Sequence, residues 1–171
     1  MDLTPSRLRK GEWIVGAGGI ALLASMFLLK WYGLTGALAP QAERAGFSTS
    51  VNGWHALTTL RWFMLVTIII SLALVYIQAS RRSPALPVSL SLVGVVVALI
   101  TLIALIYRVL INEPGSDSLI DQKTGAFVGL IAMLAIVGGG YLSLREEGVR
   151  EADGPGEIDT IPLTNVARPS A

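Results

Sequence analysis

Four nearly uncharged apolar stretches constrain the fold of this chain more than any other feature of its sequence. They run from about 12 to 29, 60 to 79, 86 to 111 and 125 to 144. About 20 apolar residues in an α-helix span the hydrocarbon core of a bilayer, and a helix satisfies its own backbone hydrogen bonds there. The sequence therefore predicts an all-α membrane protein, a four-transmembrane-helix bundle with short loops.

The residues outside these stretches divide the chain into one membrane domain and a tail. We expect residues 1–145 to form the membrane domain, with an outer loop at 33–59 that has room for a short interfacial helix. Residues 146–171 are acidic, contain Gly and Pro, and have few large apolar side chains. Such a segment buries too little apolar surface to fold, which predicts a disordered acidic cytoplasmic tail.

Composition removes several classes of partner and cofactor. The formal net charge is +1 and no basic run is interleaved with aromatic residues, so we expect no nucleic-acid partner. The chain has no cysteine, which removes disulfides, thiolate nucleophiles and iron–sulfur ligation. One histidine, His55, is too few for a haem held by paired imidazoles or for a usual zinc site. We expect no cofactor and no metal, with the lipid bilayer as the first partner.

The centres of the predicted spans lack ionisable residues. Around Ala21, Ile70, Leu99 and Ala135 there is no Asp, Glu, Lys, Arg or His, and Glu12 lies only at the edge of the first span. Ion-coupled transporters and proton relays usually need an ionisable group at mid-membrane. The sequence also has no nucleophilic-elbow serine, paired-histidine zinc motif or phosphate-binding loop. We therefore expect a protein that is not an enzyme and has no catalytic residue.

Small residues recur at helical spacing in the first and last spans. The glycines of 16–19 superficially resemble a nucleotide-binding turn, but they lie inside an apolar helix with no preceding strand. Small residues four positions apart instead let membrane helices approach closely. The sequence leaves open whether their partner is another span or another protomer. The predicted packing residues are Ala17, Ala21, Ser25, Gly125 and Gly129.

Three cations, Lys30, Arg61 and Arg108, stand at the predicted outer ends of the spans. One interpretation is that their long side chains reach interfacial water and pair with acidic residues of the outer loops. The other is that they converge beneath the outer loop and hold a lipid headgroup or another anion. The acidic residues in question are Glu43, Glu113, Asp117 and Asp121. The aromatic residues expected around a converged site are Trp31, Trp54, Trp62 and Tyr107.

The distribution of Lys and Arg near the span ends indicates an orientation. Positive residues are enriched in cytoplasmic loops, which favours cytoplasmic N- and C-termini in a plasma membrane. A cleaved signal peptide is the alternative for the first stretch, but Lys30 and two aromatic residues separate its apolar run from the small residues at 37–39. The seven inner cations are Arg7, Arg9, Lys10, Arg81, Arg82, Arg145 and Arg150. The five outer cations are Lys30, Arg44, Arg61, Arg108 and Lys123.

Several short interfacial motifs carry a resemblance. They are Arg7–Trp13, Gly53–Leu57, Ser83–Val88, Tyr107–Arg108 and Gly139–Glu147. With these motifs the chain resembles, over roughly Ser6 to Gly148, uncharacterised four-helix integral membrane proteins of high-GC Gram-positive bacteria. The resemblance implies a bacterial plasma-membrane protein with this topology, and it implies no catalytic residue.

Two functional hypotheses follow from these observations. The leading one is a non-enzymatic structural or accessory membrane component that packs with itself or with another membrane protein through its small-residue faces. The alternative is a protein that binds or transports a lipid or small solute by means of the aromatic and cationic rim at the outer ends of the spans.

Overall fold

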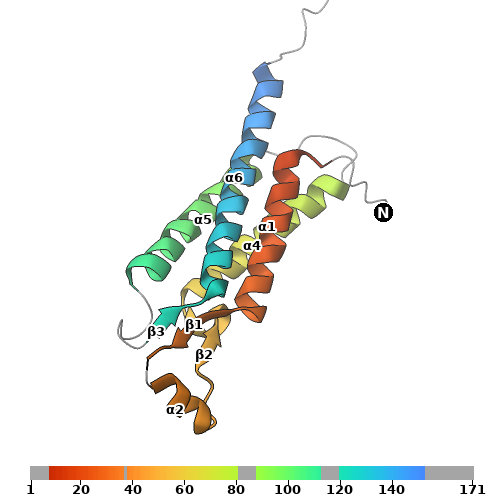
Figure 1. Ribbon diagram of the computed structural model, residues 1–171. Coiled ribbons are helices and arrows are strands. Elements are labelled where there is room, and N and C mark those ends of the chain that lie inside the picture. The colour runs from red at the N-terminus through yellow and green to blue at the C-terminus, as the bar shows by residue number, and fades with distance from the viewer. Residues whose placement is uncertain (1–7, 37, 81–87, 113–119, 153–171) are drawn as a thin grey trace, which may run out of the picture.

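Four long helices form the body of the molecule. The computed structural model describes residues 8–36, 38–80, 88–112 and 120–152. The helices are α1 (Lys10–Leu28), α4 (Leu60–Ser80), α5 (Val88–Ile106) and α6 (Thr124–Ala152). Four helical segments are long and apolar enough to cross a membrane, the third of them continuing from α5 to Ile111. The prediction of four such helices is confirmed, and Figure 1 shows them packed along one another as a bundle.

The bundle is closed by contacts between helices that are not all consecutive in the chain. α1 packs against α4 and, most extensively, against α6, and α5 packs against α4 and α6. Glycines permit the closest approach, because a Cβ at Gly11 would lie 2.7 Å from the carbonyl oxygen of Gly139. The core between the helices contains the fully buried side chains of Leu22, Met64 and Met133. Close packing of this kind is what holds helices together once they lie in an apolar solvent.

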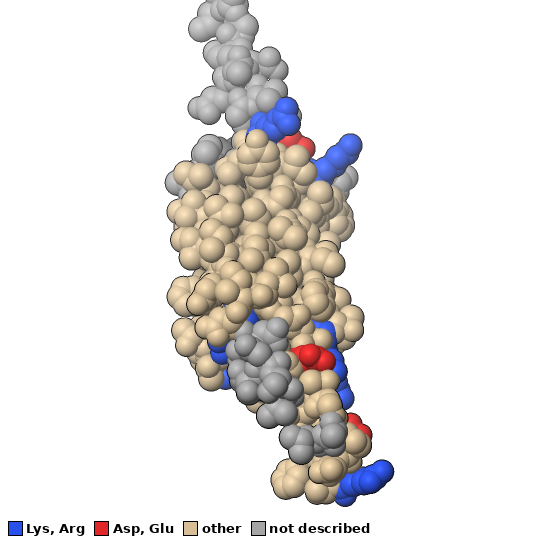
Figure 2. Space-filling view, turned by 60° about the vertical axis from the view of Figure 1, so that its left-hand side comes forward, with Lys and Arg blue, Asp and Glu red and all other residues tan. Residues whose placement is uncertain are grey.

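Charged side chains avoid the middle of the bundle. In the face shown in Figure 2, Lys, Arg, Asp and Glu lie towards the two ends, with a broad band of uncharged residues between them. Large apolar side chains of the long helices are exposed, among them Ile69, Val96, Ile103 and Ile131. An apolar belt between two charged ends is the surface expected of a bilayer-spanning bundle.

A small sheet caps one end of the bundle, and the prediction of an all-α fold was wrong on this point. The sheet has the order β2-β1-β3, with β1 (Lys30–Leu34) antiparallel to both β2 (Ser50–Asn52) and β3 (Ile120–Gln122). The strands have three to five residues each and pair across long stretches of chain. They are therefore too short to show a pattern of alternating apolar and polar residues from which strands are predicted. We call the three strands, α2 (Leu38–Arg44), α3 (Gly53–Ala56) and the described residues that join these elements the cap.

Two short helices complete the cap. α2 (Leu38–Arg44) lies at the end of the cap farthest from the bundle (Figure 1). It ends in a Schellman motif, in which Phe47 N donates to Ala42 O and Gly46 N to Glu43 O, both at 3.0 Å, with Gly46 at a φ of 82°. α3 (Gly53–Ala56) follows β2 directly, and Asn52 caps it by accepting from His55 N at 3.1 Å. The segment expected to be an outer loop is therefore largely structured.

The structure also moves one predicted boundary and shows a π-helix that was not predicted. α6 continues beyond Arg145 to Ala152, so residues 146–152 are helical, and the prediction that they are disordered was wrong. The rest of the predicted tail, residues 153–171, lies outside the described residues. A helix that leaves an apolar environment continues readily where good helix formers such as Arg145 and Glu146 follow. The last turns of the third apolar segment form the π-helix η2 (Tyr107–Ile111), whose bond from Asn112 N to Tyr107 O measures 2.8 Å.

Candidate functional site

Trp31 joins the cap to the bundle. It sits where the pairing of β1 with β2 is interrupted between Lys30 and Tyr32, and a bulge of this kind turns a side chain away from its normal direction. The indole is fully buried, and its Nε1 donates a 2.8 Å hydrogen bond to the carbonyl oxygen of Ser25 in the last turn of α1. Sequence reasoning had placed this tryptophan on an interfacial rim, whereas the structure makes it part of the core.

Three glycines make room for the Trp31 ring. A Cβ at Gly53 would lie 2.7 Å from Trp31 Cε2, and one at Gly125 would lie 2.6 Å from Trp31 Cδ1. A Cβ at Gly129 would overlap Cζ2 of the same ring. The indole thus lies against a glycine of α3 within the cap and against α6 and α1, so it fixes the cap to two helices of the bundle.

The predicted packing residues therefore serve different roles. Ser25, Gly125 and Gly129 are buried around Trp31, so their partners lie within the same chain. Ala21 is half-buried beside the core, whereas Ala17 is exposed on the outside of α1. The glycines of 16–19 do pack against neighbouring helices, since a Cβ at Gly18 would lie 2.9 Å from Ile136 Cγ1.

Arg61 belongs to an aromatic cluster at the cap end of α1 and α4. The ring centroids of Phe27 and Trp54 are 5.2 Å apart, and those of Trp54 and Trp62 are 5.6 Å apart. The guanidinium carbon of Arg61 lies 5.0 Å from the Trp54 centroid and 5.5 Å from the Trp62 centroid, and Nη1 donates to Trp54 O at 3.4 Å. The guanidinium is engaged by cation–π contacts with two rings.

A groove of about 330 Å³ separates the start of α4 from the end of α5. Its walls are mainly apolar and half-exposed, with Phe63 on α4 and Ile100 on α5 each about half accessible. Polar groups gather at the end of the groove next to the cap. The residues that line it are Leu57, Thr58, Thr59, Leu60, Phe63, Ile100, Thr101, Ala104, Tyr107 and Arg108.

Arg108 stands at the polar end of this groove. It lies in the π-helix, where its Nη1 donates to Asn112 O at 3.0 Å and its own carbonyl accepts from Tyr32 Oη at 3.4 Å. The backbone of this turn is thereby tied to β1 of the cap. Within the described part of the chain, the bond to Asn112 is the one hydrogen bond that the Arg108 guanidinium makes.

The three predicted cations occupy three different surroundings. Lys30 lines a separate hollow with Glu43 and Lys123, Arg61 stacks on two tryptophans, and Arg108 lies at the groove. Glu43, one of the proposed acidic partners, instead accepts from Thr49 Oγ1 at 3.1 Å. Glu113 and Asp117 lie outside the described residues.

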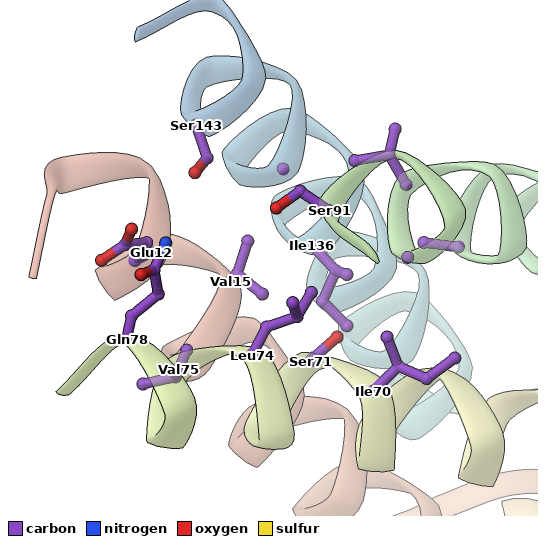
Figure 3. A pocket seen from close by; sticks show the side chains of 14 residues that line it. Glu12, Val15, Ile70, Ser71, Leu74, Val75, Gln78, Ser91, Ile136 and Ser143 are labelled. Atoms are coloured by element: carbon purple, nitrogen blue, oxygen red, sulfur yellow. The ribbon is translucent and has the colours of Figure 1, made fainter. Parts of the chain in front are cut away.

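The opposite end of the bundle holds a small, mainly apolar cavity with five polar residues in its wall, which sequence reasoning missed. All four long helices contribute a polar residue to its wall: Glu12, Ser71, Gln78, Ser91 and Ser143. The cavity measures about 40 Å³, which is room for only a few water molecules. In Figure 3 the side chains of Ser91 and Ser143 point into it from α5 and α6. Because buried hydroxyls are normally hydrogen-bonded, we expect ordered water at these groups.

Glu12 links this cavity to the start of α1. The carboxylate oxygen Oε2 accepts from the backbone N–H of Arg9 at 3.1 Å, as in a helix capping box, and the residue is buried although it is charged by type. The sequence showed Glu12 only at the edge of a span. Each of the four spans has a polar residue near the end opposite the cap. This coincidence could have predicted the cavity, but it is seen only when the four spans are aligned by their depth in the membrane. The residues are Glu12, Gln78, Ser91 and Ser143.

His55 is a hydrogen-bonded residue of the cap. Its Nδ1 lies 2.7 Å from Asn52 Oδ1, the same oxygen that caps α3. No group of three or more His, Cys, Asp or Glu side chains in the described ranges is arranged to hold a metal ion. The geometry around the histidine is that of a capped turn.

Comparison of the chain with known proteins gives no match to a family model, to a curated protein or to a solved structure. The similarity to four-helix membrane proteins of high-GC Gram-positive bacteria stays a prediction from the quoted motifs.

Proposed function

We propose that this chain is a bacterial plasma-membrane protein that crosses the bilayer four times, with both termini in the cytoplasm and the cap outside. In this proposal it is a non-enzymatic structural or accessory component. The helices anchor the cap, and the cap binds either a second copy of the chain or another membrane protein. The apolar belt of the bundle supports membrane insertion. The count of Lys and Arg near the span ends in the sequence, seven on the proposed inner side and five on the outer, supports this orientation.

The attachment of the cap by Trp31 is the observation that carries the proposal. β1 and β2 come from the segment between α1 and α4, and β3 comes from the segment between α5 and α6. Their pairing joins two segments that would otherwise move independently, and the buried indole fixes them to the helices. A binding surface that is ordered in advance loses less conformational entropy when a partner binds.

Exposed apolar side chains on the cap supply a surface for such a partner. Phe47 is 71% exposed, and Val51 on the edge strand β2 is 41% exposed. Both residues belong to the cap and not to the long helices, so lipid does not cover them in the proposed topology. Aromatic residues such as phenylalanine are enriched at protein interfaces relative to the rest of the surface. The Schellman turn at Gly46 fixes the backbone from which the Phe47 side chain projects.

The test compares Phe47→Ser with Ala45→Ser, a neighbouring exposed position. Each tagged variant and the wild-type chain are purified from native membranes in mild detergent, and protein stoichiometry is measured. We expect a stoichiometric partner or dimer with the wild type and Ala45→Ser, and its loss with Phe47→Ser. A chain that is monomeric and without a partner in all three preparations would contradict the proposed function.

A further inference from the structure

We propose that the groove between α4 and α5 binds one anionic phospholipid from the leaflet next to the cap. In this arrangement the lipid phosphate lies at Arg108, and one acyl chain follows the apolar wall made by Phe63, Ile100 and Ala104. The inference rests on the membrane insertion proposed above but is independent of any protein partner of the cap.

The length of the groove matches one leaflet. It extends from Ile100 on α5 to Arg108 on η2, a rise of about 12 Å at 1.5 Å per residue. Half of a hydrocarbon core is about 15 Å thick. An acyl chain that enters beside Arg108 therefore reaches the deep end of the groove close to the middle of the bilayer.

The deep end of the groove offers an acyl chain no unsatisfied polar group. Thr101 is the polar residue there, and it is almost fully buried. Its Oγ1 lies 2.8 Å from Val97 O and 3.1 Å from Thr67 Oγ1 on the facing helix. With that hydroxyl paired inside the protein, the surface left for a ligand is hydrocarbon.

The end of the groove next to the cap has the opposite chemistry. The Arg108 guanidinium has N–H groups beyond the one that bonds Asn112, and Thr58 and Thr59 place exposed hydroxyl-bearing residues on the same rim. Thr59 immediately precedes α4, whose first turn carries the positive end of the helix dipole. A cation, hydroxyls and a helix N-terminus together suit a phosphodiester.

This division of polarity identifies a lipid as the occupant. A free phosphate ion would gain nothing from an apolar wall that extends to mid-membrane, and a packed helix of another protein would leave the Arg108 guanidinium facing an apolar surface. An anionic phospholipid satisfies both ends of the groove at once. A zwitterionic lipid carries a compensating ammonium group, so we expect it to bind less tightly.

The chain offers close controls for both ends of the groove. Arg61 is at a similar level on α4, but its guanidinium stacks on Trp54 and Trp62, and it does not line the groove. Ile103 is on the same helix as Ala104, but it is exposed and also lies outside the groove lining. We therefore compare Arg108→Gln with Arg61→Gln, and Ala104→Phe with Ile103→Phe. A loss of lipid binding caused by the groove should appear only in the first variant of each pair, whereas a general effect of lost charge or added volume should appear in both.

The experiment measures lipid retention on the full chain by native mass spectrometry in mild detergent, with added phosphatidylglycerol or phosphatidylcholine. We expect one retained phosphatidylglycerol per chain and weaker retention of phosphatidylcholine. Arg108→Gln should lower phosphatidylglycerol affinity about tenfold, the loss of one charge-assisted hydrogen bond, and should abolish the headgroup preference. Ala104→Phe should lower retention of both lipids, and both control variants should bind as the wild type does.

Three results would overturn the groove assignment. The first is unchanged phosphatidylglycerol retention in Arg108→Gln and Ala104→Phe chains whose circular dichroism shows normal folding. The second is displacement of the lipid by millimolar inorganic phosphate, which would indicate a simple anion site. The third is a protein that co-purifies and is lost with Ala104→Phe, which would indicate a helix in the groove. Each of these results would leave the proposed membrane insertion and the proposed role of Phe47 unaffected. The experiment therefore tests the lipid site independently of the proposed function.

Discussion

The indole Nε1 of Trp31 lies 2.8 Å from the carbonyl oxygen of Ser25, to which it donates a hydrogen bond. The same carbonyl accepts from the backbone N–H of Leu29 at 3.3 Å. A carbonyl at the end of α1 thus accepts two hydrogen bonds, one from the backbone of the helix C-cap Leu29 and one from the Trp31 indole of the cap. The end of one helix and the start of the sheet are in this way a single hydrogen-bonded unit.

Replacement of Trp31 should separate the cap from the bundle. Trp31→Ala should lower the free energy of unfolding by about 3–5 kcal/mol, because it leaves a large cavity and removes a buried hydrogen bond to the Ser25 carbonyl. Trp31→Phe should cost less, about 1–3 kcal/mol, because most of the ring volume remains. Thermal unfolding in detergent, followed by circular dichroism, measures both. Trp62→Phe, at a tryptophan that is 53% exposed, is the control and should shift the midpoint little; an equal shift in Trp62→Phe would refute the structural role of Trp31.

Two glycines of α6 should respond to alanine in opposite ways. Gly129→Ala places a Cβ against the Trp31 ring and should destabilise the protein by about 1–3 kcal/mol. Gly138→Ala meets no atom within 4 Å and should be neutral or stabilising by up to about 1 kcal/mol, because alanine is the better helix former. The thermal unfolding midpoints of the two variants in detergent measure this difference. Equal shifts of the two midpoints would argue against the close contact between Gly129 and Trp31.

The hydrogen bond between Thr67 and Thr101 should couple α4 to α5. Their hydroxyl oxygens are 3.1 Å apart and both residues are buried. A double-mutant cycle of Thr67→Val, Thr101→Val and the double variant should give a coupling free energy of about 0.6 kcal/mol, and at most about 1.7 kcal/mol, as for other hydrogen bonds between membrane helices. Strict additivity of the two single changes would show that the pair contributes nothing.

Glu12 should stabilise the start of α1. Glu12→Ala removes the acceptor for the Arg9 N–H and should cost about 1 kcal/mol, whereas Glu12→Gln keeps an acceptor oxygen and should cost less. Unfolding by denaturant in detergent measures the two values. If the glutamine variant lost as much stability as the alanine variant, charge and not the capping hydrogen bond would be responsible.

The helices were predictable because hydropathy is local information. The expected spans at about 12–29 and 60–79 agree closely with α1 (Lys10–Leu28) and α4 (Leu60–Ser80). The sheet was not predictable in this way, because β1 pairs with a strand that follows two further long helices. Pairing between distant short strands depends on how the helices assemble and leaves no periodic pattern in the sequence.

The candidate sites were predictable only in their residue types. The sequence identified Arg108 as a cation at a helix end but grouped it with Lys30 and Arg61, because depth in the membrane does not specify the face of a helix. The burial of Trp31 depends on a bulge in β1 and on glycines that are far apart in the chain, including Gly53 and Gly129. These relationships exist only in three dimensions.

The absence of cysteine makes a direct test of the central claim possible, namely that four helices cross a bilayer with the cap on the outer side. Single variants Ala45→Cys, Ile69→Cys and Glu146→Cys are exposed on the cap, on the apolar belt and near the end of α6. In intact cells a membrane-impermeant maleimide should label Ala45→Cys, and it should label Glu146→Cys only after the membrane is opened. Lipid should protect Ile69→Cys in both conditions. Labelling of Ile69→Cys as fast as Ala45→Cys, or of Glu146→Cys in intact cells, would contradict the account.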